Sequence, residues 1–451
     1  MSTSTSAVME FLADTGLSEP ISPPEPVMLP LRQRFRLIET GELDPTEWHA
    51  VADAWSRRAD ARYRACTTLR SPTSDAPVVR IGIKDTVDVA GFPTTLGLRN
   101  HRHHPATSAT VVRRLRNAVV TAKVVATELN IGIGSGCGNP YFPRINPAGS
   151  STGSGVAVAA GICDISLGTD VLGSVRWPAG RCGVVGLRTT HNPNILQGVF
   201  PLCPAMDAPG WVARTADDLA FLWGRVGIGV AASTATSGPL RIGVPQEVLD
   251  GCIEPKIADA VEITVRALAY AGHEVTRVRL GDLWNWRGPA WELCARDAWN
   301  GFQVWRERIS DDLLESTMVA LETGARISDQ RYAEIFAALL RLRSEAVDVF
   351  KAQRVDAWLL PLDAVVPRPR EEKPVAASTI PTPDDPAYDR KIGYTPIASF
   401  AGLPAITFPV GRTRHAPLAV QLVGPPHTET TLIQLARDAG EVLGEMRFAP
   451  R

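Results

Sequence analysis

Two short loops rich in glycine and hydroxyl side chains constrain this chain more than any other feature of its 451 residues. The first loop reads Gly-Ser-Ser-Thr-Gly-Ser over residues 149–154, and the second reads Gly-Thr-Asp-Val-Leu-Gly-Ser over residues 168–174. Between them lies a run of Ala, Val and Gly, residues 156–163, which is too short to span a membrane and favours a buried helix. The segment therefore predicts two serine-bearing loops that bracket a helix in the core.

A serine in such a loop becomes a nucleophile when a base removes its proton and backbone N–H groups face the developing oxyanion. Small residues ahead of Ser174 permit that approach, and the second loop offers the amides of Val171, Leu172, Gly173 and Ser174. The sequence holds only six lysines, so each is worth considering as the base. Lys84 follows a short β-prone run, residues 78–83, that predicts a buried strand.

The segment 146–190 resembles the amidase signature, in which a Gly/Ser-rich loop is followed by G-T-D-x-x-G-S-x-R and a later C-G-x-x-G-L. The separation of the loops matches that family's separation between a bridging serine and a nucleophile. Residues 82–85, Gly-Ile-Lys-Asp, are similar to the family's lysine motif, and residues 401–405 and 420–422 resemble its late signature. The resemblance runs from about residue 30 to residue 445, and it rests on three separated motifs at compatible spacing.

The resemblance implies an amidohydrolase that cleaves a carboxamide C–N bond through a serine acyl-enzyme, without metal or organic cofactor. Ser174 matches the nucleophile, Ser150 the proton relay in a cis-peptide conformation, and Lys84 the ultimate base. A lysine acts as a base only when neutral, so its pKa must fall by roughly 3 from about 10.4. Burial of Lys84 behind an apolar strand would lower the pKa in that direction.

The amides of residues 171–174 match the family's oxyanion hole, and Ser151, Asp170 and Arg176 are expected to support the two loops. Asp170 and Arg176 match the acid and base that brace the nucleophile loop. Leu172 stands where the family usually has a small residue. We expect its side chain to pack behind the loop, with an acyl-site contact as the alternative.

Three other patterns suggest specific functional motifs but are weaker evidence for function. The first loop also fits G-x-S-x-G, the nucleophile-elbow motif of α/β hydrolases. That elbow needs a strand before it and a triad histidine after it. Here the preceding segment is broken by prolines, and His415 and His427 lie in turn-like contexts. The glycine-rich run 132–138 is interpreted as a flexible loop beside the active site. Residues 101–104 contain three histidines without companion ligands, which favours a solvated loop over a metal site.

The segment 284–308 is dense in tryptophan and predicts a helix. We interpret Trp291, Phe302 and Trp305 as core residues, while one or two aromatics of this segment remain candidates for lining an apolar acyl pocket. Cys182, at a family cysteine position, is interpreted as a small buried thiol.

Composition limits the classes of partner. The net charge is −1, with no basic patch for nucleic acid and no run long enough for a membrane span. Seven dispersed cysteines without a C-x-x-C pair, and no basic leader at the N-terminus, indicate a cytoplasmic protein. The expected partner is a small-molecule amide, and the N-terminal helical region is a candidate surface for a homodimer.

Alternating helical and strand patterns predict one α/β domain with a mixed, twisted central sheet covered by helices on both faces. Residues 1–27 are expected to form a disordered tail, and residues 28–451 the amidase domain. Two alternatives to hydrolysis stay open: acyl transfer to an amine on the same site, and a catalytically silent amidase-like binding subunit.

Overall fold

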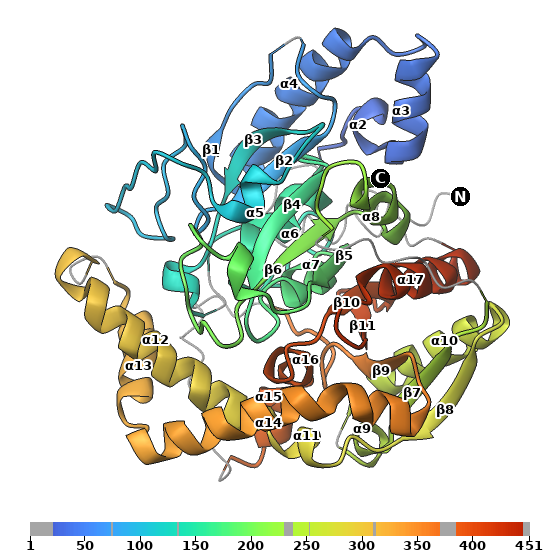
Figure 1. Cartoon of the computed structure of the whole chain (residues 1–451). Coiled ribbons are helices and arrows are strands. Elements are labelled where there is room, and N and C mark those ends of the chain that lie inside the picture. The colour runs from blue at the N-terminus through green and yellow to red at the C-terminus, as the bar shows by residue number, and fades with distance from the viewer. Residues whose placement is uncertain are drawn as a thin grey trace.

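The computed structural model of the chain describes residues 21–73, 75–132, 135–229, 238–251, 253–309, 313–369 and 385–444. Eleven strands within these residues form one sheet that runs through the molecule (Figure 1). In order across the sheet they are β1 Cys66–Leu69, β3 Val119–Val124, β2 Arg80–Lys84, β4 Ile165–Asp170, β6 Ala208–Ala213, β5 Val185–Arg188, β10 Ala405–Arg412, β11 Pro417–Val423, β9 Ala357–Pro361, β7 Arg241–Pro245 and β8 Glu274–Val278.

The sheet is mixed and buried on both faces. Strand β2 pairs parallel with β3 and β4, the strands from β4 to β9 pair antiparallel, and β7 pairs parallel with β8 and β9. Along β9, Ala357 and Leu359 belong to one core cluster, while Trp358 and Leu360 belong to another. Successive side chains of a strand point to opposite faces, so both faces carry a core. The predicted α/β class with helices on both faces is confirmed.

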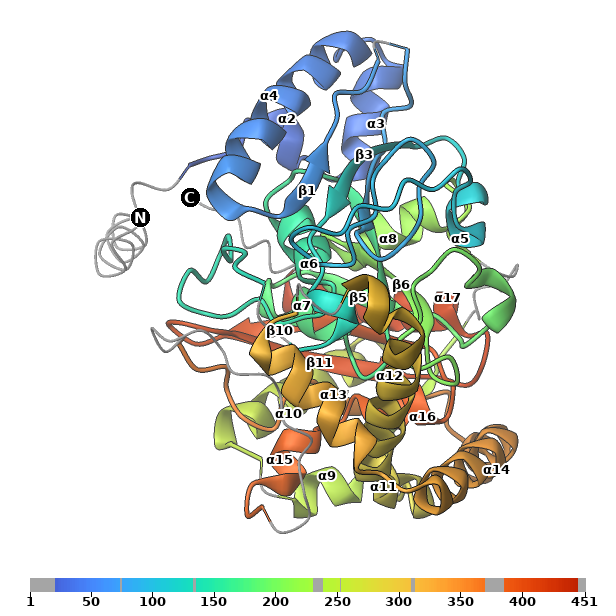
Figure 2. The ribbon, with the colours of Figure 1, turned by 90° about the vertical axis from the view of Figure 1, so that its left-hand side faces the viewer.

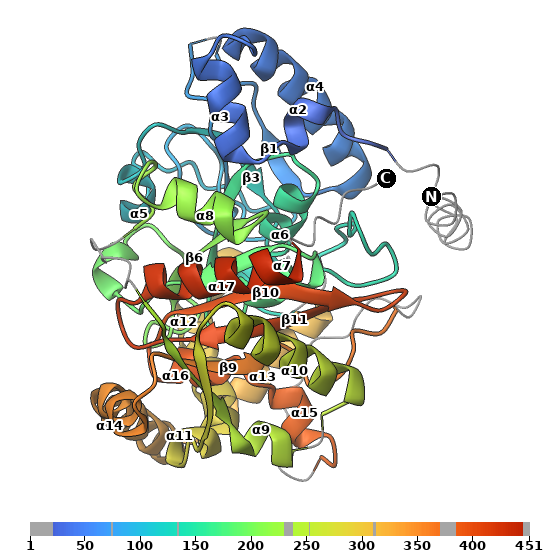
Figure 3. The same ribbon diagram turned by 90° about the vertical axis from the view of Figure 1, so that its right-hand side faces the viewer.

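Helices of one face are α8 Ala216–Trp223, α10 Pro255–Tyr270 and α17 Glu429–Leu443, which lie in front of the sheet in Figure 3. On α17 the buried residues Leu432, Leu435 and Ala439 recur at helical spacing and join the core cluster of that face. Helices α6 Thr152–Ala159 and α7 Arg176–Arg181 cover the opposite face. Every residue of α6 is buried, as the apolar run between the two loops predicts.

The N-terminal helices α2 Glu25–Met28, α3 Leu31–Glu39 and α4 Pro45–Tyr63 form a layer at the end of the sheet near β1 (Figure 1). The Asp44 carboxylate accepts hydrogen bonds from the first-turn amides of α4, as expected of an N-cap residue before proline. Residues 1–20 of the predicted tail lie outside the described residues, and the predicted boundary at residue 27 falls inside α2, where Val27 is buried.

The long helices α12 Arg287–Ile309, α13 Glu315–Ala325 and α14 Asp329–Gln353 lie beside the lower half of the sheet, and α12 packs against α13 (Figure 2). The tryptophan-dense segment is therefore helical, as predicted. Short elements complete the fold: α5 Thr110–Arg113, η1 Glu128–Asn130, η2 Pro193–Ile195, α9 Gln246–Asp250, α11 Asp282–Asn285, α15 Tyr388–Ile392 and α16 Pro396–Phe400. None of the helices in the described ranges has the length and apolar character needed to cross a membrane.

Candidate active site

The two predicted loops lie against each other. The amide of Ser151 donates to the carbonyl oxygen of Ser174 over 3.1 Å, and the Ser151 hydroxyl donates to the carbonyl oxygen of Thr169 over 3.1 Å. Because Ser151 precedes α6 and Thr169 lies in β4, these bonds fix the end of the strand against the start of the helix. Ser151 thus joins the segments that carry Ser150 and Ser174.

Lys84 is the last residue of β2 and is fully buried. Its Nζ lies 2.8 Å from Oγ of Ser150 and 2.8 Å from Oγ1 of Thr169. Strand β2 pairs directly with β4, which is why the lysine reaches both loops. Sequence reasoning missed Thr169, although its place inside the G-T-D motif was the signal that could have found it.

Burial lowers the pKa of Lys84 from 10.5 to about 7, with the carboxylates of Asp207 and Asp170 opposing that shift. Desolvation disfavours the charged form of an amine, so a substantial fraction of this lysine is neutral near pH 7. The adjacent Asp85 is paired with Lys123, whose Nζ lies 3.5 Å from Oδ1 of Asp85. Lys84 is therefore suited to accept a proton.

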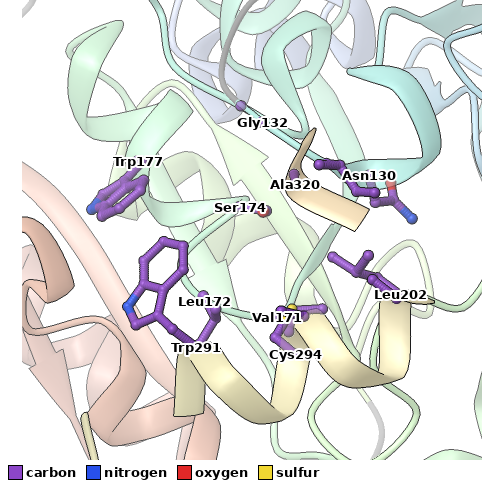
Figure 4. A pocket seen from close by; sticks show the side chains of 14 residues that line it. Asn130, Gly132, Val171, Leu172, Ser174, Trp177, Leu202, Trp291, Cys294 and Ala320 are labelled. Carbon is purple, nitrogen blue, oxygen red and sulfur yellow. The ribbon is translucent and has the colours of Figure 1, made fainter. Parts of the chain in front are cut away.

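The hydroxyl groups of the two serines differ in environment. Ser150 is 1% exposed, and the peptide bond that joins Gly149 to it is cis, in agreement with the conformation that the family resemblance implies. Ser174 is half-buried and lies at the cavity described below (Figure 4). Its hydroxyl forms no hydrogen bond within the described part of the chain. Ser174 is thus the hydroxyl open to a bound molecule.

The backbone amides in the loop between β4 and α7 differ in whether they already have a hydrogen-bond acceptor among the described residues. The amide of Gly173, predicted for the oxyanion hole, instead donates to the Asp170 carboxylate over 3.0 Å and is already engaged. The amides of Val171, Leu172 and Ser174 donate to no acceptor among the described residues. Three of the four predicted amides therefore remain available to an oxyanion.

The backbone conformation and surroundings of residue 173 exclude a side chain. Its φ is +109°, and a Cβ built on it would lie 2.8 Å from Oγ1 of Thr395. The same Oγ1 donates to the carbonyl oxygen of Leu172 over 2.6 Å. A glycine is required by both the backbone conformation and this close contact.

The supporting ion pair is larger than the sequence predicts. Asp170 and Arg176 pair at 2.9 Å, and Arg188 adds a second guanidinium 3.4 Å from the same carboxylate oxygen. Burial opposes ionisation of Asp170, yet the two arginines hold the pKa of this carboxyl well below its usual range. Arg176 also donates to Oε1 of Gln421 over 2.8 Å and to the carbonyl oxygen of Thr395 over 3.0 Å. The nucleophile loop is thereby anchored to the C-terminal part of the sheet.

A cavity of about 100 Å³ opens beside Ser174 (Figure 4). It is lined by Asn130, Ile131, Gly132, Gly149, Val171, Leu172, Ser174, Trp177, Leu202, Trp291, Cys294, Ala295, Ala298 and Ala320.

The cavity lining bears on the predictions made for the tryptophan-dense segment and for Leu172. Trp291, predicted as a core residue, packs against a core cluster and also lines the cavity, which was the alternative for one or two of these aromatics. Phe302 is buried in a separate cluster, and Trp305 packs against Phe200. Leu172 does both things proposed for it, since it is 7% exposed within a core cluster and also lines the cavity.

The competing interpretations do not describe this site. Ser151, which would be the nucleophile of an elbow motif, has its hydroxyl hydrogen-bonded to the backbone of Thr169 rather than to a histidine. Cys182 is buried, as a structural thiol would be. Within the described ranges, no three His, Cys, Asp or Glu side chains are grouped so as to hold a metal ion.

Known proteins resemble this chain over most of its length. The family described as Amidase matches residues 42–433. A 2-amino-5-chloromuconic acid deaminase from Comamonas testosteroni is 31% identical over 81% of this chain and 81% of that protein. One subunit of the glutamyl-tRNA(Gln) amidotransferase from Thermus thermophilus is 29% identical over 79% of this chain and 83% of that protein.

Solved structures give the same fold. A crystal structure of an amidase superposes with a TM-score of 0.78 at 26% identity, over 92% of this chain and 100% of that one. A 6-aminohexanoate cyclic dimer hydrolase superposes with a TM-score of 0.76 at 23% identity, over 93% and 98% of the two chains. The chain therefore belongs to the amidase signature family, a family of hydrolases that act on amide C–N bonds.

Proposed function

We propose that this protein hydrolyses a carboxamide through an acyl-enzyme on Ser174, with Ser150 and Lys84 completing a Ser-Ser-Lys triad. The observation that carries the proposal is the 2.8 Å contact between Nζ of Lys84 and Oγ of Ser150, made by a fully buried lysine with a pKa of about 7. Neutral Lys84 accepts the proton of Ser150, and Ser150 in turn accepts the proton of Ser174. The Ser174 oxygen attacks the amide carbonyl carbon and forms the first tetrahedral intermediate.

The remaining steps follow from the same groups. The amides of Val171, Leu172 and Ser174 stabilise the oxyanion, while Gly173 holds the loop through Asp170. Ser150 returns the proton to the leaving amine, the C–N bond breaks, and the acyl group remains on Ser174. Water then attacks the ester with the same proton relay, which releases the carboxylic acid and restores the serine.

A serine-directed fluorophosphonate probe tests the nucleophile and also separates an enzyme from a silent binding subunit. We expect the probe to label the wild type and to leave Ser174→Ala unlabelled, with amide hydrolysis lost in the same variant. Ser154→Ala is the matched control, because Ser154 is a buried serine of α6 whose hydroxyl donates to the carbonyl oxygen of Leu167. Equal labelling of wild type and Ser174→Ala would assign the nucleophile elsewhere.

A further inference from the structure

The cavity beside Ser174 carries no charged side chain among its described lining residues. Asn130 is its only side-chain amide, and both ends of that amide are engaged: Oδ1 accepts from Thr86 over 3.1 Å, and Nδ2 donates to the carbonyl oxygen of Phe200 over 3.2 Å. The Cys294 thiol stays neutral, because burial raises its pKa well above the usual value. A bound molecule therefore meets an uncharged surface.

The charged groups of the site lie beneath the loops rather than in the cavity. Lys84, Asp170 and Arg176 are all fully buried, and none of them lines the cavity. Lys84 contacts Ser150 and Thr169, Asp170 pairs with two arginines, and Arg176 also contacts Thr395 and Gln421. Among the described lining residues, a substrate carboxylate finds no cation to pair with, and an unpaired charge removed from water is strongly disfavoured.

Two tryptophans form one side of the cavity. Trp177 of α7 and Trp291 of α12 have ring centroids 6.3 Å apart and an interplanar angle of 33°. The Trp291 indole N–H donates to the carbonyl oxygen of Ile392 over 3.1 Å, so the polar edge of this ring is already engaged. In Figure 4 both indole nitrogens lie on the side of the ring away from Ser174. Carbon edges and ring faces are thus turned toward the serine, which suits a planar apolar group.

Alanines on the two facing helices leave room for such a group. Ala295 and Ala298 of α12 and Ala320 of α13 also line the cavity. The cavity volume is about 100 Å³, of the same order as the roughly 150 Å³ apolar cavity that binds benzene. The volume is therefore of the order that a single ring occupies, and Ser174 belongs to the same lining.

We propose that the substrate is an uncharged amide in which a single aromatic or alicyclic ring adjoins the scissile carboxamide. The ring lies between the Trp177 and Trp291 side and the alanines of α12 and α13, next to the Ser174 hydroxyl. This inference rests on the proposed function and specifies its substrate class. It also distinguishes the chain from an enzyme selective for amides of acidic molecules.

Matched pairs of amides test the proposal. Benzamide is compared with 4-carbamoylbenzoate for a ring on the acyl side, acetanilide with 4-acetamidobenzoate for a ring on the amine side, and acetamide serves as the ringless reference. We expect at least one neutral ring amide to exceed its carboxylate counterpart in kcat/KM by 100-fold or more, and to exceed acetamide. Comparable rates on the neutral and anionic members of both pairs would overturn the proposal.

Variants of α12 locate the ring. Trp291→Ala should reduce the preference for the ring amide over acetamide by at least tenfold, whereas Trp299→Ala should leave it unchanged. Trp299 is the matched control because it lies on the same helix, packs against Phe302 and does not line the cavity. Ala298→Leu, which fills the cavity without removing a tryptophan, should reduce the same preference and covers the case in which Trp291→Ala does not fold. Equal effects of Trp291→Ala and Trp299→Ala, or a preference unchanged in Ala298→Leu, would contradict the placement.

Calorimetric binding to Ser174→Ala separates this inference from the proposed function. Tighter binding of the neutral ring amide than of its carboxylate counterpart supports the substrate class even if the wild type turns over no amide, in which case the proposed function alone fails. Ser174-dependent hydrolysis that favours the anionic amides would retain the function and refute the substrate class. Absence of binding by every ring amide would also refute it.

Discussion

Replacing Lys84 by methionine should abolish activity and at the same time remove a pH-dependent loss of stability. The side chain is fully buried, and its pKa falls from 10.5 in the unfolded chain to about 7 in the folded one. The unfolded chain therefore binds more protons than the folded chain between these two values. Consequently Lys84 makes the free energy of unfolding rise with pH across this window, and its destabilising effect is complete below about pH 7.

The magnitude follows from the two pKa values. Their difference of roughly 3.5 corresponds to a penalty of about 5 kcal/mol at low pH. Between pH 6 and pH 9 the penalty falls by about 2–3 kcal/mol, which is the part that an experiment can isolate. Methionine also leaves the hydroxyls of Ser150 and Thr169 without the Nζ contact, at a cost of about 1–3 kcal/mol that varies little with pH.

The assay is urea unfolding of wild type and Lys84→Met at pH 6, 7.5 and 9. We expect the stability advantage of Lys84→Met over wild type to shrink by about 2–3 kcal/mol from pH 6 to pH 9, because other titrating groups are common to both proteins. In parallel, wild-type kcat should rise with pH to a plateau with an apparent pKa near 7. The kcat of Lys84→Met should be several orders of magnitude lower than that of the wild type. Parallel stability profiles for the two proteins, or wild-type-like activity in Lys84→Met, would refute the reasoning.

Three further perturbations test the loop that carries Ser174. Gly173→Ala should lose activity and destabilise the fold by about 1–3 kcal/mol, because a Cβ meets Thr395 at a φ of +109°; unchanged kcat and unfolding midpoint would count against this contact. Leu172→Gly should lower the free energy of unfolding in urea by about 3 kcal/mol and broaden acceptance of bulky acyl groups, since this leucine is both packed in the core and part of the cavity lining. Unchanged stability together with an unchanged range of accepted acyl groups would exclude both roles. Arg176→Ala should destabilise by about 3–5 kcal/mol because it breaks a buried pair, and Arg176→Lys should recover only part of that stability, which the same unfolding measurement can show.

The sequence was sufficient for the residues whose relation is local or carried by a motif. Lys84, Ser150 and Ser174 were placed by separated motifs, and the structure brings Lys84 and Ser150 into contact while Ser174 lies at the cavity. The buried helix between the loops followed from its uniformly apolar composition. The cap of helix α4 is local in the same sense, because Asp44 accepts from the amides of residues that directly follow it.

What the sequence did not show depends on partners brought together by the fold. Arg188 reaches Asp170 because β5 and β4 both pair with β6, and no local pattern reports that. Gln421 and Thr395 contact Arg176 across more than 200 residues of sequence. Trp291 packs against the core and also lines the cavity, and a helix with tryptophan on several faces does not reveal which face meets the cavity. The hydrogen bond from the Gly173 amide to the Asp170 carboxylate depends on the direction of one amide, which no sequence pattern reports.

The long-range anchoring of Arg176 bears on how the enzyme matures during synthesis. Every member of the proposed triad has been translated once residue 174 is complete, but Thr395, Ser399 and Gln421, which hold Arg176, leave the ribosome more than 200 residues later. A nascent chain that stops before these residues carries Lys84 and Ser174 without this part of the brace on the Ser174 loop. In the proposed mechanism, the serine is therefore present long before the loop that carries it is fully supported.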